Sequence, residues 1–288
     1  MLSIGCEKTC DCPPNHLNCL TAKEWVKAMI SVWEVSYSGV DIRDKKLHPA
    51  VFPVALAERV IETFTHKGEL VVDPFVGSGT TLVAACRKVR SAVGFDLRED
   101  YVKLSASRVD ALEHTGTAQL SVCDDARNIP QYLSSNSISL VFTSPPYAGL
   151  LNRKRRNKSR HTDTRQNEQF ETVEQYSQDT RDLGTLGVEE FSETAAGIFA
   201  KLLPLLRKNA HVVVNMGNNL WSKNRRHDLY SPLAASMEGV GYELRNVIVW
   251  DKRKLVNGTG IFGWPSNFIT LGASYEYLFD FTVRQEPR

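Results

Sequence analysis

The sequence contains no apolar run approaching the roughly 20 residues that a membrane-spanning helix needs. Its N-terminal residues also lack an apolar core of the length found in signal peptides. We therefore expect a cytoplasmic protein with no membrane partner, whose six cysteines are thiols. Net charge is low, because 35 Lys and Arg residues oppose 33 Asp and Glu residues, and this excludes a histone-like polycation. A local basic patch is enough to dock phosphates, so a nucleic-acid enzyme is not excluded.

The length of 288 residues suggests one large domain or two small ones. Four cysteines crowd the first nineteen residues with the spacing C-x3-C-x-C-x6-C, which is not a standard zinc pattern, although four thiolates could close a tetrahedral site. We expect a loosely ordered N-terminal arm and a helix over residues 1–40, followed by one main domain over 41–288. The crowded cysteines are Cys6, Cys10, Cys12 and Cys19; Cys86 and Cys123 are expected to be small core residues.

Apolar runs alternate with helical patterns along the middle of the chain. The runs predict strands at 70–75, 91–97, 118–125, 137–147 and 210–216, and helical periodicity predicts helices at 21–36, 48–66, 80–89 and 100–114. Thr21 and Glu24 are spaced as a capping box at the first helix. This alternation predicts a doubly wound α/β fold with a mostly parallel sheet. Residues 246–252 and 274–283 are expected to add a C-terminal antiparallel hairpin.

Two polar stretches are too long for simple connections. Residues 148–190 are basic at first and acidic later, and residues 253–273 are rich in Gly, Asn and Trp. We expect both to be functional loops inserted into the main domain.

A glycine-rich turn follows the strand at 70–75, in the sequence Asp73-Pro-Phe-Val-Gly77-Ser-Gly79-Thr-Thr81. Its glycines let the backbone turn tightly and approach a ligand closely. No Lys follows them, which excludes a P-loop, and Leu82 occupies the third glycine position of a dinucleotide fingerprint. A nucleotide-like cofactor without a pyrophosphate would account for both absences.

Acidic residues end the next two strands. Asp96 can accept hydrogen bonds from two ribose hydroxyls, and Asp124 and Asp125 end the strand at 118–125, near where a purine amino group would lie. Each acid taken singly could be a loop carboxylate or a helix cap. The carboxyl ends of parallel strands form the ligand-binding edge of such sheets, so the series predicts one shared cleft.

The strand at 137–147 ends in Thr143-Ser144-Pro145-Pro146-Tyr147. Consecutive prolines lack N–H donors and fix φ, so they can aim carbonyl groups into a cleft. The aromatic ring that follows is suited to stacking on a flat base. Alone, such a segment is often only a turn.

The two motifs together resemble the amino-methylating DNA methyltransferases, which use S-adenosylmethionine to modify the exocyclic amine of cytosine or adenine. The resemblance covers roughly residues 40–150 and 200–283, and includes HPAVFP at 48–53 and VIVWDK at 247–252. It implies a seven-stranded-type methyltransferase sheet with inserted DNA-contacting loops. Here the glycine turn precedes the catalytic turn, whereas the commonest Ser-Pro-Pro-Tyr arrangement of the family has the reverse order.

The resemblance also assigns roles to individual residues. Cofactor contacts are expected from His48, Pro49, Phe52, Asp73, Phe75, Gly77, Gly79, Thr80, Thr81, Asp96, Leu97, Asp124, Asp125 and Thr143. The target base is expected to be held by Ser144, Pro145, Pro146 and Tyr147. The Ser144 side chain and the Pro145 carbonyl would accept the amine hydrogens, so that the nitrogen can attack the sulfonium methyl in line. No Pro-Cys dipeptide is present, which argues against methylation at carbon 5 of cytosine.

Double-stranded DNA with a flipped target base is the expected partner. A basic run directly after the catalytic turn is expected to clamp phosphates: Arg153, Lys154, Arg155, Arg156, Lys158 and Arg160. The loop at 253–273 and the residue before it could supply base contacts or a stacking ring, through Lys252, Arg253, Lys254 and Trp264. Trp264 could equally be a core residue, and no metal is expected.

The Ser form of the catalytic turn favours cytosine N4 as the acceptor, with adenine N6 as the alternative. An RNA or protein amino-methyltransferase uses a similar turn, but only 72 residues precede Asp73, which leaves little room for an RNA-binding domain. A DNA-binding protein on an inactive scaffold is disfavoured by the two intact motifs. A partner restriction endonuclease stays an open alternative.

Overall fold

A single large sheet organises the computed structural model, which describes residues 1–44, 51–113, 115–147, 179–217, 219–222, 225–254, 263–264, 268–269 and 274–285. The strands of this sheet are β1 (Val32–Glu34), β2 (Leu70–Asp73), β3 (Ser91–Asp96), β4 (Gln119–Cys123), β5 (Ile138–Thr143), β6 (Leu206–Gly217), β9 (Tyr242–Asp251) and β12 (Tyr275–Val283). Two separate ribbons pair β7 (Asn219–Ser222) with β8 (Arg225–Asp228) and β10 (Gly263–Trp264) with β11 (Phe268–Ile269). The sheet has the order β1-β9-β12-β6-β5-β2-β3-β4.

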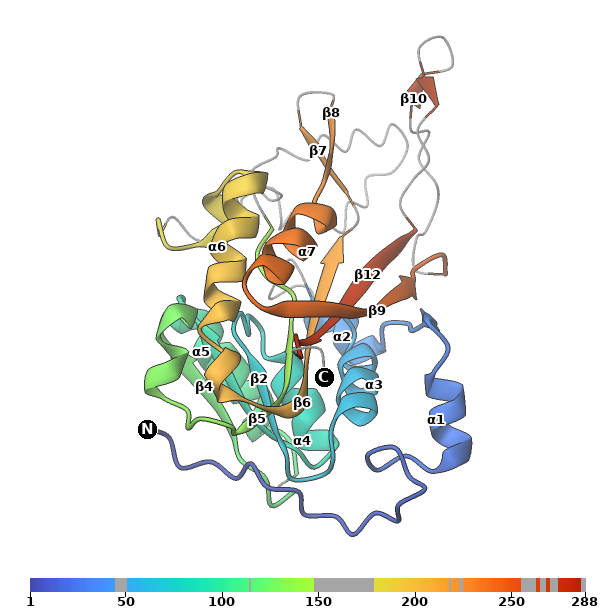
Figure 1. Cartoon of the computed structure of the whole chain (residues 1–288), viewed down its shortest axis with the longest axis vertical. Coiled ribbons are helices and arrows are strands. Elements are labelled where there is room, and N and C mark those ends of the chain that lie inside the picture. The colour runs from blue at the N-terminus through green and yellow to red at the C-terminus, as the bar shows by residue number, and fades with distance from the viewer. Residues whose placement is uncertain are drawn as a thin grey trace.

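The helices connect these strands as the sequence predicts for βαβ units (Figure 1). They are α1 (Ala22–Ala28), α2 (Gly39–Asp44), α3 (Val54–Phe64), α4 (Thr80–Arg87), α5 (Glu99–Asp110), α6 (Val188–Ala200) and α7 (Tyr230–Gly239), with short 3-10 turns η1 (Ala126–Gln131), η3 (Leu183–Thr185) and η4 (Leu203–Leu205). Apolar side chains of α3 and α4 form one buried cluster with the sheet, and those of α6 and α7 form another. The sheet is therefore covered on both faces, which confirms the doubly wound α/β fold.

The C-terminal antiparallel hairpin is confirmed. β12 lies between β6 and β9 and runs antiparallel to both, while the pairs from β6 to β4 are parallel. The sheet has one strand more than the seven expected, because β1 joins its edge in parallel with β9.

That extra strand lies where the sequence predicts the second half of a helix. The capping box of Thr21 and Glu24 is present, but α1 ends at Ala28. Trp33 then lies in β1 with 1% of its surface exposed, and the Arg59 guanidinium stacks over its ring at 4.3 Å. Burial of a large aromatic side chain and pairing with β9 therefore outweigh the helical spacing of the apolar residues.

The N-terminal arm is ordered against the body of the protein, so the expectation of a loosely ordered arm is wrong. The Leu2 amide donates to the Tyr132 carbonyl at 2.7 Å, and the Thr9 amide donates to the Lys67 carbonyl at 2.8 Å. Figure 1 shows the arm passing along the side of the sheet opposite to β7 and β8.

Of the two cysteines expected in the core, Cys86 is buried but Cys123 is exposed. The prediction for Cys123 is wrong because this residue ends β4, the edge strand of the sheet.

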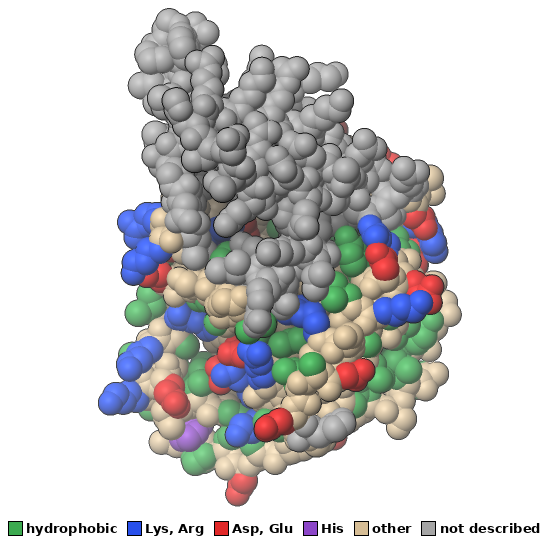
Figure 2. Space-filling view, turned by 180° about the vertical axis from the view of Figure 1, so that it is seen from behind, with side chains coloured by type: hydrophobic (Ala, Val, Ile, Leu, Met, Phe, Trp, Pro, Cys, Tyr) green, Lys and Arg blue, Asp and Glu red, His purple; other side chains and the backbone are tan. Residues whose placement is uncertain are grey.

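No helix among the described residues is long and apolar enough to cross a membrane. On the face shown in Figure 2, basic and acidic side chains of the described residues are interspersed, without one large patch of either sign.

Candidate active site

An open pocket lies at the carboxyl edge of β2, β3, β4 and β5. The expected cofactor residues that line it are Phe52, Phe75, Gly77, Thr80, Asp96, Leu97, Asp124 and Asp125, and the expected catalytic residues that line it are Ser144 and Pro146. The glycine turn and the catalytic turn, which are distant in sequence, thus line the same pocket.

Asp73, Gly79, Thr81 and Thr143 are not among the lining residues. Asp73 is buried and its carboxylate accepts hydrogen bonds from the Thr81 and Thr143 hydroxyls, both at 2.6 Å. Burial raises the pKa of Asp73 to about 6, although these hydrogen bonds oppose the shift. This carboxylate joins β2, α4 and β5 directly beneath the pocket.

Gly79 is required by close packing at the start of α4. Its φ of +82° lies in the left-handed region, and an added Cβ would come within 2.2 Å of the Ser105 hydroxyl. The glycine turn can therefore pass close to α5 and present the amide of Gly77 toward β3.

Asp96 fixes the glycine turn and faces the pocket at the same time. Its carboxylate accepts hydrogen bonds from the Gly77 amide at 3.0 Å and from the Arg98 amide at 2.9 Å. Burial raises the pKa of Asp96 to about 6, while these two N–H donors oppose the shift. A carboxylate held in this way has remaining lone pairs that can accept further hydrogen bonds.

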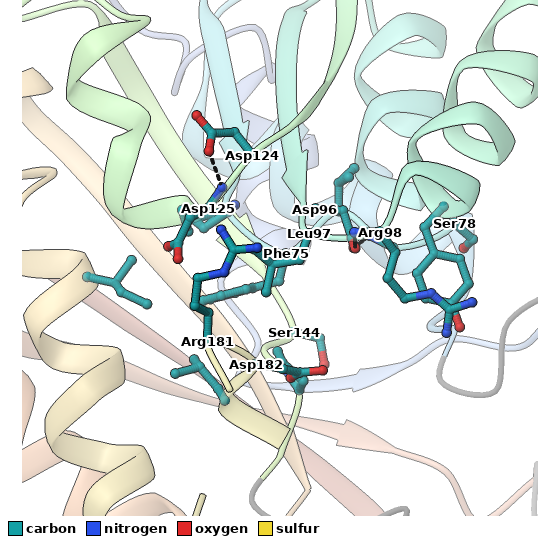
Figure 3. Close-up of a pocket in the computed structure, with 18 of the residues that line it drawn as sticks. Phe75, Ser78, Asp96, Leu97, Arg98, Asp124, Asp125, Ser144, Arg181 and Asp182 are labelled. Atoms are coloured by element: carbon teal, nitrogen blue, oxygen red, sulfur yellow. Dashed lines mark hydrogen bonds between the residues drawn. The ribbon is translucent and has the colours of Figure 1, made fainter. Parts of the chain in front are cut away.

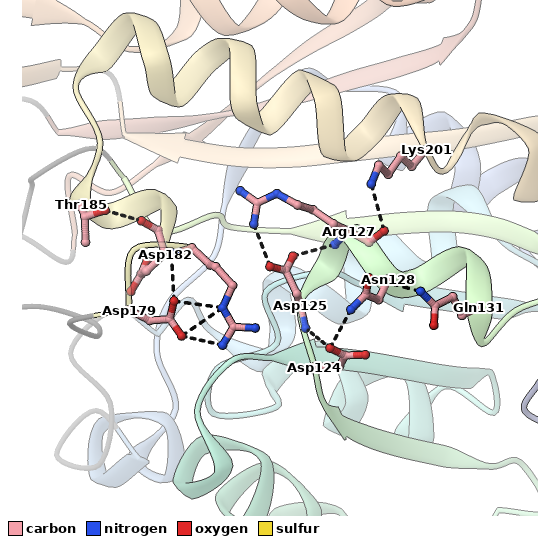
Figure 4. Close-up of polar contacts among 10 residues, drawn as sticks. Asp124, Asp125, Arg127, Asn128, Gln131, Asp179, Asp182, Thr185 and Lys201 are labelled. Carbon is pink, nitrogen blue, oxygen red and sulfur yellow. Dashed lines mark hydrogen bonds and ion pairs between the residues drawn. The ribbon is translucent and has the colours of Figure 1, made fainter.

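Asp124 and Asp125 follow β4 and are held by different partners (Figure 4). The Asp124 carboxylate accepts hydrogen bonds from the Tyr132 hydroxyl at 2.7 Å and from the side-chain amide of Asn128 at 2.9 Å. Burial would raise the pKa of Asp124, but these hydrogen bonds lower it on balance. Asp125 caps η1 and forms an ion pair with Arg127 at 2.7 Å.

Part of the pocket wall comes from residues that the sequence analysis missed. Arg181, Asp182 and Leu183 line the pocket, although the sequence assigns them to the polar loop 148–190. Figure 3 shows Asp182 and Ser144 across the pocket from Asp96 and Asp124. Asp182 is buried and accepts from the Gly184 amide at 2.8 Å, so it caps η3 and fixes this wall. Arg98 and Ile198 also line the pocket and were likewise not predicted.

Ser144 and Tyr147 form a hydrogen-bonded pair at the end of β5. Their hydroxyl oxygens are 2.9 Å apart, and the Tyr147 hydroxyl donates to the Asn215 carbonyl at 2.8 Å. The Gly217 amide donates to the same Tyr147 oxygen at 3.3 Å. Tyr147 is 8% exposed and is not among the lining residues, so its ring lies against β6 behind Ser144. Pro145 is buried as well.

The Tyr147 proton is used toward Asn215, and a phenol has only one proton to donate. Ser144 must therefore be the donor in its hydrogen bond with Tyr147. Both lone pairs of the Ser144 oxygen then remain available to a donor in the pocket. The geometry makes Ser144 a hydrogen-bond acceptor toward any bound amine.

The described cations of the predicted DNA-contacting set each pair with a carboxylate. Lys252 pairs with Glu276, Arg253 pairs with Asp251 at 2.7 Å, and Lys254 pairs with Glu34. His48, Pro49, the run Arg153–Arg160 and the Trp264 side chain lie outside the described residues.

Comparison with known proteins finds similarity over part of the chain. Residues 15–107 match the sequence model of a family described as DNA methylase. The match includes the glycine turn and Asp96 and ends before Ser144.

Type II methyltransferase M.HpaI of Haemophilus parainfluenzae is 37% identical over 81 residues, 28% of this chain and 26% of the relative. Type II methyltransferase M.ScaI of Streptomyces caespitosus is 41% identical over 68 residues, 24% of this chain and 22% of the relative. The matched region therefore spans about a quarter of the length of these curated relatives.

Among solved structures, TrmN from Thermus thermophilus is 16% identical with a TM-score of 0.49, covering 84% of this chain and 52% of that one. A TehB-like SAM-dependent methyltransferase from Corynebacterium glutamicum is 14% identical with a TM-score of 0.47, covering 85% and 96%.

Proposed function

We propose that this chain transfers the methyl group of S-adenosylmethionine to an exocyclic amino group of a base in DNA. The observation that carries the proposal is that Asp96 and Ser144 line one pocket, because a carboxylate suited to ribose hydroxyls then faces the same cavity as an amine acceptor. The family match over residues 15–107 and the identity to Type II methyltransferases support DNA as the substrate class.

The pocket fits S-adenosylmethionine in its chemistry. Asp96 offers carboxylate oxygens to the ribose hydroxyls, while Phe75, Leu97 and Ile198 give apolar surface for the adenine ring. No Lys follows the glycine turn to meet phosphates, in keeping with a cofactor that has none. When bound, S-adenosylmethionine supplies an electrophilic methyl group on a positively charged sulfur.

Ser144 would act on the amine of the substrate. The lone pair of an aromatic amine is delocalised into its ring, so the nitrogen is a poor nucleophile. A hydrogen bond from the amine to the Ser144 oxygen would favour a pyramidal nitrogen and release that lone pair. Bound S-adenosylmethionine would supply the methyl group from its sulfonium sulfur to this nitrogen, and the methylated nitrogen would release its extra proton to water. Catalysis would rest on positioning and electrostatics, without a covalent nucleophile.

We propose cytosine N4 as the acceptor, with adenine N6 as the alternative. Both bases carry an amine beside an acceptor nitrogen, so the chemistry of the amine does not distinguish them. The Ser144 form of the turn supports cytosine through the family resemblance. The base would leave the DNA stack to reach Ser144, and the run Arg153–Arg160 would hold the flanking phosphates. No observation on the chain favours RNA or protein acceptors.

The decisive experiment incubates the purified chain with methyl-labelled S-adenosylmethionine and, separately, DNA, RNA and protein. Nucleosides from the DNA are then separated by mass spectrometry. We expect N4-methylcytosine, and a Ser144→Ala variant that binds the cofactor but transfers far less methyl. Methyl only on adenine would make the cytosine assignment wrong. Labelled RNA or protein without labelled DNA, or cofactor binding without transfer to any acceptor, would contradict the proposal itself.

A further inference from the structure

Three cysteines of the N-terminal arm converge on a histidine that is distant in sequence. The Cys10 sulfur lies 3.3 Å from Nδ1 of His66, and the Cys19 sulfur lies 3.8 Å from the same nitrogen. The Cys19 sulfur is 3.4 Å from that of Cys10 and 3.6 Å from that of Cys12. All four potential ligand atoms lie within 4.8 Å of one another.

These distances match the edges of a zinc tetrahedron. Zn–S bonds of about 2.3 Å and Zn–N bonds of about 2.0–2.1 Å give edges of about 3.8 Å between sulfurs and about 3.6 Å between sulfur and nitrogen. Four of the six edges run from 3.3 to 3.8 Å, and the other two are within 4.8 Å. A disulfide would instead bring two sulfurs to about 2.05 Å, and all three cysteines are free thiols in the structure.

The backbone around the cluster supports thiolate ligands. The Lys67 amide points at the Cys19 sulfur with a distance of 3.3 Å, and an N–H donor stabilises a charged sulfur. Cys6, the fourth cysteine of the arm, lies outside the cluster, because its sulfur contacts Glu7 and Arg207 instead. His66 therefore provides the fourth potential ligand, in place of a fourth cysteine.

The position of the cluster indicates a structural role. His66 lies in the turn between α3 and β2, at the edge of the sheet opposite to the pocket. The arm is already close to this turn, since the Asn18 amide donates to the Thr63 carbonyl at 2.5 Å. Gly68 has no room for a Cβ, which would come within 2.5 Å of the Glu7 carbonyl oxygen.

We propose that Cys10, Cys12, Cys19 and His66 bind one Zn²⁺ ion that fastens the N-terminal arm to the turn between α3 and β2. The three thiols lose their protons to solvent on binding, and the histidine binds as the neutral imidazole. Four protein ligands leave no position for water or substrate, as in structural zinc sites. A soft Cys₃His set favours zinc over magnesium or calcium.

Metal analysis of the full chain, purified without chelators, tests this site. We expect about one zinc per chain in the wild type, and a loss of most of the zinc in Cys19→Ser and His66→Ala. The matched controls are Cys6→Ser, in the same arm, and Cys86→Ser, in α4, which should keep the zinc. His66→Cys supplies a thiolate ligand in place of the imidazole and should restore zinc binding, which would not happen if the loss in His66→Ala came from misfolding.

Replacement of the metal by Co²⁺ gives a second measurement that does not depend on activity. The wild type should show the intense visible absorption of tetrahedral cobalt and sulfur-to-cobalt charge transfer. Absence of stoichiometric metal, or the weak spectrum of octahedral cobalt, would overturn the proposal. A disulfide among Cys10, Cys12 and Cys19 in the chain as purified, without chelators and under reducing conditions, would also overturn it.

Discussion

The Ser144 hydroxyl donates its proton to the Tyr147 oxygen at 2.9 Å, because the Tyr147 proton is used by the carbonyl of Asn215. Tyr147 is thus a positioning residue that turns the lone pairs of Ser144 toward the pocket. The aromatic residue of the catalytic turn contributes through its hydroxyl in this arrangement, while its ring is buried and does not line the pocket.

A Tyr147→Phe substitution tests this relationship. Loss of the phenol oxygen frees the Ser144 proton, which can then point at the amine and repel it. We expect kcat for methyl transfer to fall by about tenfold, the effect of one hydrogen bond of about 1–1.5 kcal/mol. Cofactor affinity and KM for DNA should change little. An equal loss of cofactor affinity and kcat would indicate a general disturbance of the pocket instead.

An Asp96→Ala substitution is expected to weaken binding of S-adenosylmethionine by roughly tenfold or more, since charge-assisted hydrogen bonds contribute about 1.5–3 kcal/mol. Isothermal titration calorimetry measures this directly. The pKa of Asp96 is raised to about 6 by burial, so the wild-type affinity should also fall as the pH drops below 6 and the carboxylate is protonated. Asp96→Asn should bind weakly at every pH. An unchanged affinity in folded Asp96→Ala would remove Asp96 from the cofactor site.

Asp73 predicts a pH dependence of folding stability. Its pKa is raised from 3.8 to about 6 by burial, so the folded state binds the proton more tightly than the unfolded chain. The stability from this group is present at low pH and is lost as the pH rises through about 4–6. The loss should be on the order of 3 kcal/mol.

Urea unfolding of the wild type and Asp73→Asn at several pH values isolates this contribution. The wild type should lose stability relative to the variant between pH 4 and pH 7. The exposed Glu190→Gln serves as the control, and its profile should stay parallel to the wild type. Parallel profiles for wild type and Asp73→Asn would show that Asp73 does not titrate in this range.

The basic run is predicted to bind DNA phosphates. Replacing Arg153, Arg155 and Arg156 with Gln should reduce the slope of log K against log salt concentration by about three units. Fluorescence anisotropy of labelled DNA across a salt series measures the slope. Lys23→Gln with Lys27→Gln in α1 is the control. An unchanged slope in the triple variant would mean that the clamp lies elsewhere.

The order of strands and helices from β2 to β5 could be predicted from the sequence, because each buried strand is a short apolar run bounded by turn residues, whereas α6, between β5 and β6, was not predicted. The glycine turn and Ser144 could also be predicted, since their motifs are local. Trp33 could not, because helical spacing and an edge strand use the same apolar residues, and only pairing with β9 decides between them.

The missed parts of the two sites depend on contacts between distant segments. Arg181 and Asp182 carry no local motif, and they reach the pocket only because η3 and α6 pack across β5 and β6. His66 is likewise invisible in the cysteine spacing, since it is brought to Cys10 and Cys19 by the turn before β2. Local patterns predict a motif, but they cannot predict its partner across the sheet.

The antiparallel pairing of β9 and β12 fixes both ends of the segment that connects these two strands. The chain leaves β9 at Asp251 and enters β12 at Tyr275, and these two residues are paired in register. Both ends of the connection are thus fixed by the sheet, at the edge where the parallel strands form the pocket. Because the sheet holds both ends, we expect an exchange of this segment for one of different length to leave Ser144 and Asp96 in place. The sheet would then accept different sequences between β9 and β12, and these sequences would differ in the molecules that they admit to the pocket.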